Sequence, residues 1–213
     1  MNYSALIVAA GKGTRMGLGY NKMFYMLKGG KTVLEQTMEL FLNDEQCKQI
    51  VIVTNRTDMP KIVKSNESGK IVSVNGGDTR QESVFNGLMA VKEDVVLIHD
   101  GARPWLQRPL VDRLLLAMET EKAAILAVKV KDTIKKVVGN YIERTVNRDD
   151  HVLAQTPQAF HTTFILDCYQ KAFALGIEAT DDAQIVETCS EQRVRVVEGS
   201  YANIKITTQE DVQ

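Results

Sequence analysis

The chain has 213 residues, of which 44% are hydrophobic and 25% charged, the composition of a globular protein with a sizeable core. Its formal net charge is −1, so no overall field favours nucleic acid or an anionic membrane, and any anion site must be built locally. The N-terminus has no basic segment before an apolar run, no stretch approaches the roughly 20 apolar residues of a membrane helix, and the three cysteines are widely spaced. These features predict a cytoplasmic protein with reduced thiols.

Five short apolar runs predict β-strands, and each is rich in Val, Ile and Leu, as parallel strands covered on both faces should be. The runs lie at 5–10, 49–54, 70–74, 94–99 and 123–128. Segments with helical periodicity separate them, and "TDDAQ" (180–184) has the spacing of a helix start. Alternating strands and helices predict an α/β fold with a mostly parallel sheet flanked by helices.

The segment 129–156 breaks this rhythm. Its runs "TIKKVV" and "YIERTV" alternate around Gly139 and Asn140, which predicts a β-hairpin and not a crossover helix. A hairpin inserted in a parallel-sheet domain often projects and needs a cover, for which a partner subunit is a natural candidate. We therefore expect one domain over 1–213 with an inserted β-arm at about 129–152.

The stretch "LIVAAGKGTRMG" (6–17) ends an apolar run in a glycine-rich loop, which suits phosphate binding. The loop lacks the Gly-Lys-Ser/Thr of a P-loop, and Met16 replaces the third glycine of the dinucleotide fingerprint. Lys12, Arg15 and Lys22 lie close by, and side-chain cations help a triphosphate that undergoes substitution. The structural alternative is a glycine-rich turn with solvated surface cations.

Three further motifs are candidates for ligand contact. "VNGGDTRQESV" (74–84) follows a strand with two glycines and opens a helix. "LIHDGARP" (97–104) places Asp100 and Arg103 at the end of a buried strand, where open parallel sheets bind ligands. "NIKITT" puts Lys205 in a strand-like alternation, for which a solvated edge strand is the alternative interpretation.

The histidines show no His-x-x-x-His or Cys/His grouping, so a dedicated zinc site is not expected. A nucleophile elbow and an obvious acid–base pair are also missing from the sequence. A phosphate oxygen as nucleophile is already largely ionised at neutral pH and requires no general base. Positioning and charge stabilisation would then suffice for catalysis.

Together these motifs resemble one known family, the 2-C-methyl-D-erythritol 4-phosphate cytidylyltransferases of non-mevalonate isoprenoid synthesis. The resemblance runs in order through "AAGKGTRMG", "GGDTRQESV", "HDGARP", "VKDTIK", "TVNRD", "QTPQAF", "TDDA" and "VEGSYANIKITT". It covers nearly the whole chain, and the combination is specific although each motif alone is not.

The resemblance implies a Rossmann-like α/β domain whose extended β-arm interlocks two subunits in a homodimer. It also implies the reaction, in which the phosphate of the polyol substrate attacks the α-phosphorus of CTP and pyrophosphate leaves. Mg²⁺ would be held mainly by the CTP phosphates, with Asp100 as a candidate metal ligand.

Residue roles follow from the same resemblance, motif by motif. The catalytic residues implied are Arg15, Lys22, Arg148 and Lys205, of which Arg15 and Lys22 would stabilise the pentavalent transition state. The nucleotide would be bound, largely through backbone groups, by Ala9, Ala10, Gly11, Gly13, Thr14, Gly77, Asp78, Arg80, Ser83, Asp100 and Gly101. The polyol phosphate would be bound by Asp100, Arg103, Thr180, Lys205 and Thr207, and by Thr133 and Arg148 from the partner's arm.

Three features depart from the family pattern. Asn21 stands before Lys22 where a proline is usual, so we expect greater mobility of this segment. Asn147 stands where an Asp is common, so the orientation of Arg148 is expected to differ. The sequence ends at Gln213, where relatives usually continue into a short helix.

Alternative functions remain open at this point. A ribitol-5-phosphate cytidylyltransferase is similar throughout, although "HDGARP", "QTPQAF" and "TDDAQIVE" look more like the methylerythritol enzyme. An NAD-dependent oxidoreductase is disfavoured by Met16, and a non-catalytic nucleotide-binding module by the joint presence of Arg15, Lys22, Arg148 and Lys205. Pyrophosphate release with CTP and either polyol phosphate discriminates among these functions.

Overall fold

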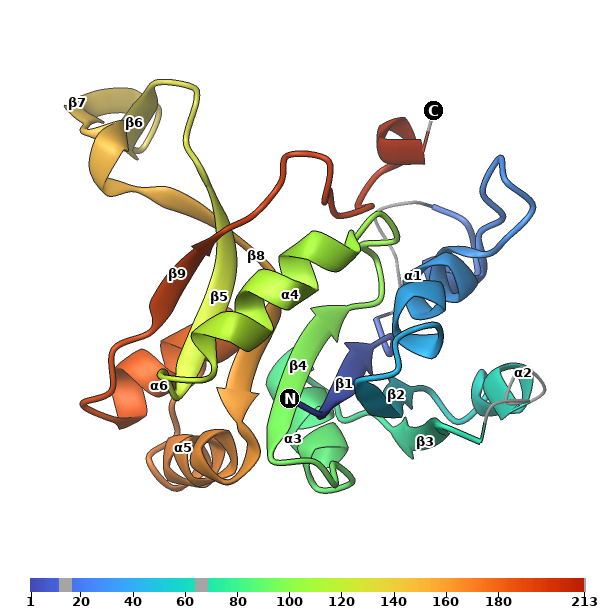
Figure 1. Cartoon of the computed structure of the whole chain (residues 1–213). Helices are drawn as coiled ribbons and strands as arrows, with labels where there is room; N and C mark the ends of the chain where they lie inside the picture. The colour runs from blue at the N-terminus through green and yellow to red at the C-terminus, as the bar shows by residue number, and fades with distance from the viewer. Residues whose placement is uncertain (12–16, 64–68, 213) are drawn as a thin grey trace.

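The computed structural model describes residues 1–11, 17–63 and 69–212 (Figure 1). The strands are β1 (Tyr3–Val8), β2 (Cys47–Thr54), β3 (Ile71–Asn75), β4 (Val95–Asp100), β5 (Ala123–Lys129), β6 (Ile134–Val138), β7 (Tyr141–Val146), β8 (Val152–His161) and β9 (Arg195–Glu198). The α-helices are α1 (Val33–Leu42), α2 (Met59–Val63), α3 (Arg80–Leu88), α4 (Arg108–Ala117), α5 (Thr162–Ala174) and α6 (Asp182–Cys189). Short 3₁₀ helices are η2 (Lys22–Phe24), η3 (Arg148–Asp150) and η4 (Gln209–Val212).

The main sheet has seven strands in the order β3-β2-β1-β4-β8-β5-β9 (Figure 1). Strands β1 to β4 pair in parallel, β8 runs antiparallel to both β4 and β5, and β9 is parallel to β5. The chain builds outward from β1 to β3 and then returns to the other side of β1 with β4. This reversal is a topological switch point, the place where open α/β sheets bind ligands.

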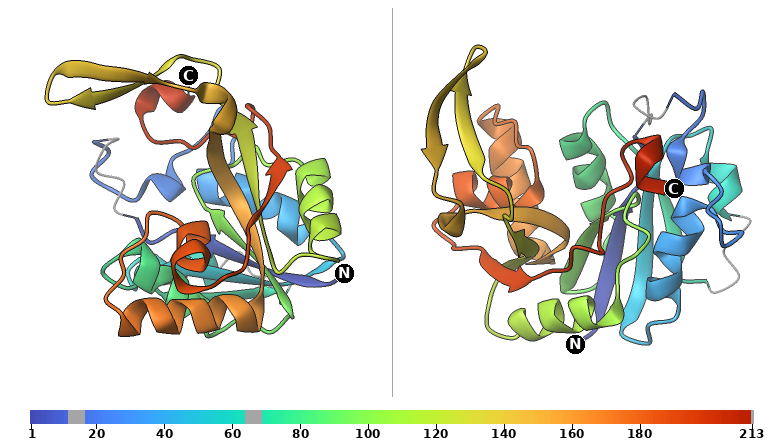
Figure 2. Two further views of the ribbon diagram at one scale, coloured as in Figure 1. Left: turned by 90° about the vertical axis from the view of Figure 1, so that its left-hand side faces the viewer. Right: turned by 90° about the horizontal axis from the view of Figure 1, so that it is seen from above.

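Helices cover both faces of this sheet, so its central strands are apolar on both sides (Figure 2). On β1, Ile7 belongs to the core beside α1 and α4, and Leu6 belongs to the core beside α3, α5 and α6. Neither side chain is exposed to solvent. The nearly unbroken apolar runs therefore correspond to strands buried on both faces, and the predicted mostly parallel α/β fold is confirmed.

Strands β6 and β7 form a separate antiparallel hairpin that projects from the body of the molecule (Figure 2). Gly139 has a positive φ of 57° at the turn, which a two-residue hairpin connection requires. Apolar side chains of the hairpin are unusually open, with Val137 59% and Tyr141 82% exposed. The predicted hairpin is thus confirmed, and its surface carries apolar groups that the described chain does not cover.

Two strands and one loop differ from the sequence prediction. Strands β8 and β9 were not predicted, because β8 contains Pro157 and runs antiparallel inside an otherwise parallel pattern. The segment 203–208 is not a strand: the Ile206 N–H donates to the Ala102 carbonyl (2.8 Å), and no strand is assigned there. The strand-like alternation around Lys205 was therefore misleading, since Ile206 packs into the core from a loop.

The predicted start of α6 is confirmed, because the Asp181 side chain accepts a hydrogen bond from the Gln184 N–H (3.0 Å). Over the described ranges, none of the helices combines the length and the apolar character needed to cross a membrane.

Candidate active site

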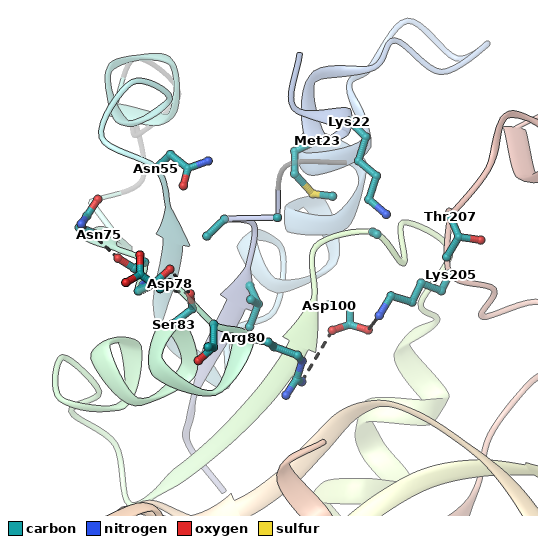
Figure 3. Close-up of a pocket in the computed structure, with 17 residues that line it drawn as sticks. Lys22, Met23, Asn55, Asn75, Asp78, Arg80, Ser83, Asp100, Lys205 and Thr207 are labelled. Atoms are coloured by element: carbon teal, nitrogen blue, oxygen red, sulfur yellow. Dashed lines mark hydrogen bonds and ion pairs between the residues drawn. The ribbon is translucent and has the colours of Figure 1, made fainter. Parts of the chain in front are cut away.

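A cleft of about 650 Å³ opens at the carboxyl ends of the parallel strands, around the switch point between β1 and β4 (Figure 3). The backbone and side chains of four strand ends and the C-terminal loop form its walls. The lining residues are Val8, Ala10, Gly11, Lys22, Met23, Asn55, Asn75, Gly76, Gly77, Asp78, Thr79, Arg80, Ser83, Asp100, Ala102, Lys205 and Thr207.

The wall after β3 is a tight turn that leads into α3. A Cβ atom on Gly76 would lie 2.7 Å from the Ala10 Cβ, so only glycine allows this turn to approach the end of β1 so closely. The Gly77 N–H donates to the Ser83 hydroxyl (3.1 Å), and Thr79 and Glu82 form a reciprocal capping box at the helix start. Backbone groups here lie next to a helix N-terminus, an arrangement that attracts anions.

Asp100 stands at the end of β4 and faces three cations, of which Figure 3 shows Arg80 and Lys205. Its carboxylate lies 2.8 Å from the Lys205 ammonium, 3.7 Å from the Arg80 guanidinium and 3.8 Å from the Nε of Arg103. Burial alone would raise the pKa of Asp100, but Lys205, Arg80 and Arg103 lower that pKa to about 2. The carboxylate is therefore ionised at neutral pH and balances part of a positive cluster.

Arg80 is held by a second carboxylate from a distant part of the chain. Its two terminal nitrogens donate to both oxygens of the buried Asp182 (2.9 and 2.8 Å), and the Tyr169 hydroxyl donates to the same group (2.6 Å). Burial opposes the charge of Arg80, but Asp182 and then Asp100 raise its pKa above the ordinary value. The guanidinium is therefore fixed between α3 and α6 with one edge toward Asp100.

A buried histidine orders the backbone around Asp100. His99 Nε2 lies 3.1 Å from the Arg103 carbonyl, which can only accept, so Nε2 carries the proton. Nδ1 then accepts a hydrogen bond from the Thr156 hydroxyl (3.1 Å), whose oxygen accepts from the Asp100 N–H (3.0 Å). A neutral imidazole satisfies this arrangement, and burial lowers the pKa of His99 to about 4.

Lys22 enters the cleft from η2 and is largely buried. Its ammonium donates to the Ile206 carbonyl (2.6 Å), which joins η2 to the segment that carries Lys205. Asn21 adopts φ −64°, a value that proline also allows, and its side chain accepts from the Met23 N–H (3.1 Å). Asn21 thus restrains the segment by hydrogen bonds.

A second hollow, of about 420 Å³, lies at the base of the hairpin. It is lined by Thr133, Thr145, Val146, Asn147, Arg148 and Asp149. The exposed Arg148 donates to the Lys131 carbonyl (2.5 Å), and Asn147 accepts from the Asp149 N–H (3.3 Å) as the cap of η3. Asn147 therefore gives the cap interaction that an Asp would give at this position.

The cleft brings together ten residues named from the sequence: Ala10, Gly11, Lys22, Gly77, Asp78, Arg80, Ser83, Asp100, Lys205 and Thr207. Ala9 and Gly101 are buried behind the cleft wall, and Arg103 reaches Asp100 from outside the lining. Thr180 bonds to Gln184 at the start of α6, and Thr133 and Arg148 line the hairpin hollow. Gly13, Thr14 and Arg15 lie outside the described residues.

Sequence analysis missed several residues that shape the site. Asn55 and Asn75 line the cleft at the ends of β2 and β3, and their place after predicted strands was a usable signal. Asp182 lies within the recognised "TDDA" motif, but its pairing with Arg80 spans 102 positions. Thr156 gave no signal, because its role depends on the unpredicted strand β8.

The described residues contain no group of three or more His, Cys, Asp or Glu side chains that could hold a metal ion by themselves. Asp100 is an ionised oxygen donor at the cleft, which suits a hard cation such as Mg²⁺ as one ligand among several. A metal bound there would need further oxygens from the ligand.

A Rossmann-like sheet with a glycine turn and a cation cluster at its switch-point cleft is the arrangement of a nucleotidyltransferase. The sequence model described as "IspD: 2-C-methyl-D-erythritol 4-phosphate cytidylyltransferase" matches residues 3–213. The chain therefore belongs to the 2-C-methyl-D-erythritol 4-phosphate cytidylyltransferase family.

Individual relatives agree with this assignment. The cytidylyltransferase of that name from Geobacillus thermodenitrificans is 43% identical over 217 residues, which span 100% of this chain and 94% of that protein. The crystal structure of 4-diphosphocytidyl-2C-methyl-D-erythritol synthase from Anaerococcus prevotii has a TM-score of 0.88 at 38% identity, covering 99% of this chain and 92% of that one. The Thermus thermophilus enzyme has a TM-score of 0.84 at 35% identity, with 100% and 96% covered.

His99 makes stability depend on pH. The folded protein keeps His99 neutral down to about pH 4, whereas the unfolded chain takes up a proton near pH 6.5. Stability is therefore fully present above about pH 6.5 and falls by about 1.4 kcal/mol per pH unit as pH drops toward 4. In urea titrations between pH 7.5 and 4.5, the free energy of unfolding of His99→Gln should depend less on pH than that of the wild type. The difference in slope should be at most the uptake of one proton on unfolding, which is about 1.4 kcal/mol per pH unit. His151→Gln, at an exposed position, is the control and should leave the slope unchanged.

Proposed function

We propose that the cleft joins CMP from CTP to 2-C-methyl-D-erythritol 4-phosphate. An oxygen of the substrate phosphate forms a bond to the α-phosphorus of CTP, the bond from that phosphorus to the bridging oxygen breaks, and pyrophosphate leaves with the electron pair. The ionised phosphate needs no general base. The observation that carries the proposal is the cation cluster around Asp100, placed opposite the glycine turn at one switch point.

The nucleotide occupies the side of the cleft formed by β1 and the β3–α3 turn. Ala10, Gly11 and Gly77 present backbone groups at close range, and Ser83 supports the turn by its bond to Gly77. Asp78 lies on the same wall. Gly13, Thr14 and Arg15 complete this side in the proposal by their place in the recognised motif.

The opposite side binds the polyol phosphate and the developing charge. Lys22 and Lys205 reach the cleft from segments joined by the Ile206 carbonyl, so both ammonium groups are held before substrate arrives. The Nε–H of Arg103 is buried 3.8 Å from the Asp100 carboxylate and makes no hydrogen bond within the described part of the chain, so it can donate to a phosphate oxygen that reaches Asp100. Donors fixed in advance stabilise a transition state without reorganisation.

Mg²⁺ supplies charge neutralisation on the triphosphate when it is bound. We propose Asp100 as its protein ligand, since the pKa of Asp100 keeps an oxygen donor ionised beside the phosphates. Three unpaired cysteines fit the cytoplasmic location that we propose.

We also propose that the chain is a single domain whose arm dimerises. The exposed apolar side chains of Val138, Tyr141 and Ile142 on the hairpin suit burial against a partner. Thr133 and Arg148 line the hollow at the base of the hairpin. The hairpin strands β6 and β7 lie well apart from β3 and α3 in Figure 1, which fits a contribution to the site of the other subunit. Arg148 would hold the substrate phosphate there by charge-assisted hydrogen bonds.

The substrate assignment is tested by pyrophosphate release. With CTP and Mg²⁺, 2-C-methyl-D-erythritol 4-phosphate should release pyrophosphate far faster than ribitol 5-phosphate, and without a polyol phosphate release should be negligible. Faster release with ribitol 5-phosphate would overturn the substrate and leave the cytidylyltransferase chemistry intact.

Lys22 is expected to act mainly on the transition state. Lys22→Ala should lower kcat by about 10²-fold or more while KM for CTP changes less, because charge grows at the leaving pyrophosphate as the bond breaks. Lys31→Ala, which removes an exposed lysine paired with Glu39, is the matched control and should keep kcat. An unchanged kcat with a raised KM for CTP would make Lys22 a ground-state binder.

Whether the arm of one subunit contributes Arg148 to the active site of the other is tested by mixing two inactive variants. Arg148→Ala and Lys22→Ala homodimers should both be nearly inactive, but a hybrid has one site without either residue and one intact site. In an equal, fully exchanged mixture about a quarter of all sites are intact, given two-fold symmetry and random pairing. Activity near a quarter of wild type supports sharing between subunits. Hybrids that are demonstrably present yet inactive would place Arg148 in its own subunit's site.

A further inference from the structure

The side chain just before Lys22 is the most connected polar group at the edge of the cleft. Asn21 is almost fully buried and caps η2, the short helix that begins with Lys22. An amide side chain offers one acceptor oxygen and a nitrogen with two N–H donors. All three capacities are used: Oδ1 accepts from the Met23 N–H (3.1 Å), and Nδ2 donates to the Ala9 carbonyl and to the Asp58 carboxylate (3.0 Å each).

These three bonds reach three different segments of the cleft wall. Ala9 follows β1 at the start of the glycine loop, and Met23 lies in η2 beside Lys22. Asp58 belongs to the turn after β2, where its N–H donates to the carbonyl of Asn55 (3.0 Å), a cleft residue. Asn21 therefore fixes η2, which carries Lys22, against the segments that follow β1 and β2.

Asp58 is a buried carboxylate that the proposed chemistry does not use. One oxygen accepts from Asn21, and the other lies 3.3 Å from the Lys61 ammonium. Lys61 in turn lies over the ring of Phe24 in η2, 4.3 Å from its centre. The segment after β2 is thus joined to η2 twice, by the polar bond from its turn and by the cation–ring contact from α2.

We propose that Asn21 and Asp58 are positioning residues for Lys22. The pair holds η2 so that the Lys22 ammonium meets the phosphates in the orientation that the transition state requires. Lys22 lines the cleft, whereas Asn21 and Asp58 lie behind it among the described residues, so both act through Lys22. This inference rests on the function proposed above for Lys22.

A double-mutant cycle tests the proposal. Asn21→Ala should lower kcat by about 10- to 100-fold, because small misplacements of a catalytic group cost that much, while KM for CTP stays within about threefold. In the Lys22→Ala background, Asn21→Ala should lower kcat no further, since the group that it positions is absent. Thr32→Ala, which removes the N-cap of α1 away from the cleft, is the matched control and should keep kcat.

Four further variants separate positioning from a loss of folding. Asn21→Pro keeps φ near the observed −64° without the amide, so its kcat should lie above that of Asn21→Ala. Asp58→Asn keeps an acceptor oxygen for Asn21 and should stay near wild type, whereas Asp58→Ala should lose kcat as Asn21→Ala does. Lys61→Ala leaves the Asn21 bond intact and should be close to wild type.

The outcomes distinguish failure of the role proposed for Lys22 from failure of the positioning role proposed for Asn21 and Asp58. If Lys22→Ala keeps kcat, the role proposed for Lys22 fails, and the positioning role fails with it. If Lys22→Ala loses kcat but Asn21→Ala does not, or the two losses multiply in the double variant, only the positioning role is overturned. A raised KM for CTP with unchanged kcat in Asn21→Ala would overturn it as well, by making Asn21 part of nucleotide binding.

Discussion

One buried carboxylate holds the cations of the cleft in place. Asp100 balances Lys205, Arg80 and Arg103 from a single point at the end of β4. Without that charge the three positive groups would repel one another, although Arg80 would keep Asp182 as a partner. The site is therefore assembled before any phosphate arrives, and the incoming anions meet cations whose positions are already set.

The antiparallel strand β8 builds the support behind this carboxylate. Thr156 on β8 accepts the Asp100 N–H, and Gln158 two residues later bonds to Asp181 and to the Ala183 N–H at the start of α6. The start of α6 is thereby held where Asp182 can take the Arg80 guanidinium. A strand inserted against the parallel direction thus connects the acid at the centre of the cleft with the helix that restrains one of its cations.

The sequence predicted the framework because its signals are local. Continuous apolar runs are typical of buried strands such as β1 to β5, and two-residue alternation around Gly139 is typical of a hairpin. The bounds of these elements could therefore be predicted within a few residues. Glycine and charge motifs at strand ends also indicated most of the cleft lining. Asp182, Thr156 and Asn21 could not be assigned, because each acts through a partner that only the folded topology brings near. The strand-like alternation at 203–208 was misleading for the same reason, because Ile206 is buried whereas Ile204 is 41% exposed, and the backbone pairs with the Ala102 carbonyl instead of with a neighbouring strand.

The loop after β9 links the catalytic side of the cleft with the base of the arm. The Tyr201 hydroxyl donates to the Lys129 carbonyl (2.7 Å), and the Tyr201 ring has the Lys131 ammonium 3.6 Å from its centre. The Lys131 carbonyl accepts from Arg148 at the foot of the hairpin (2.5 Å). Four residues after Tyr201, the same loop presents Lys205 to Asp100, and the next carbonyl accepts from Lys22. The geometry of the hairpin base and that of the lysine pair are therefore set by one continuous segment, so the arm is part of the site's own scaffold as well as a projection from it.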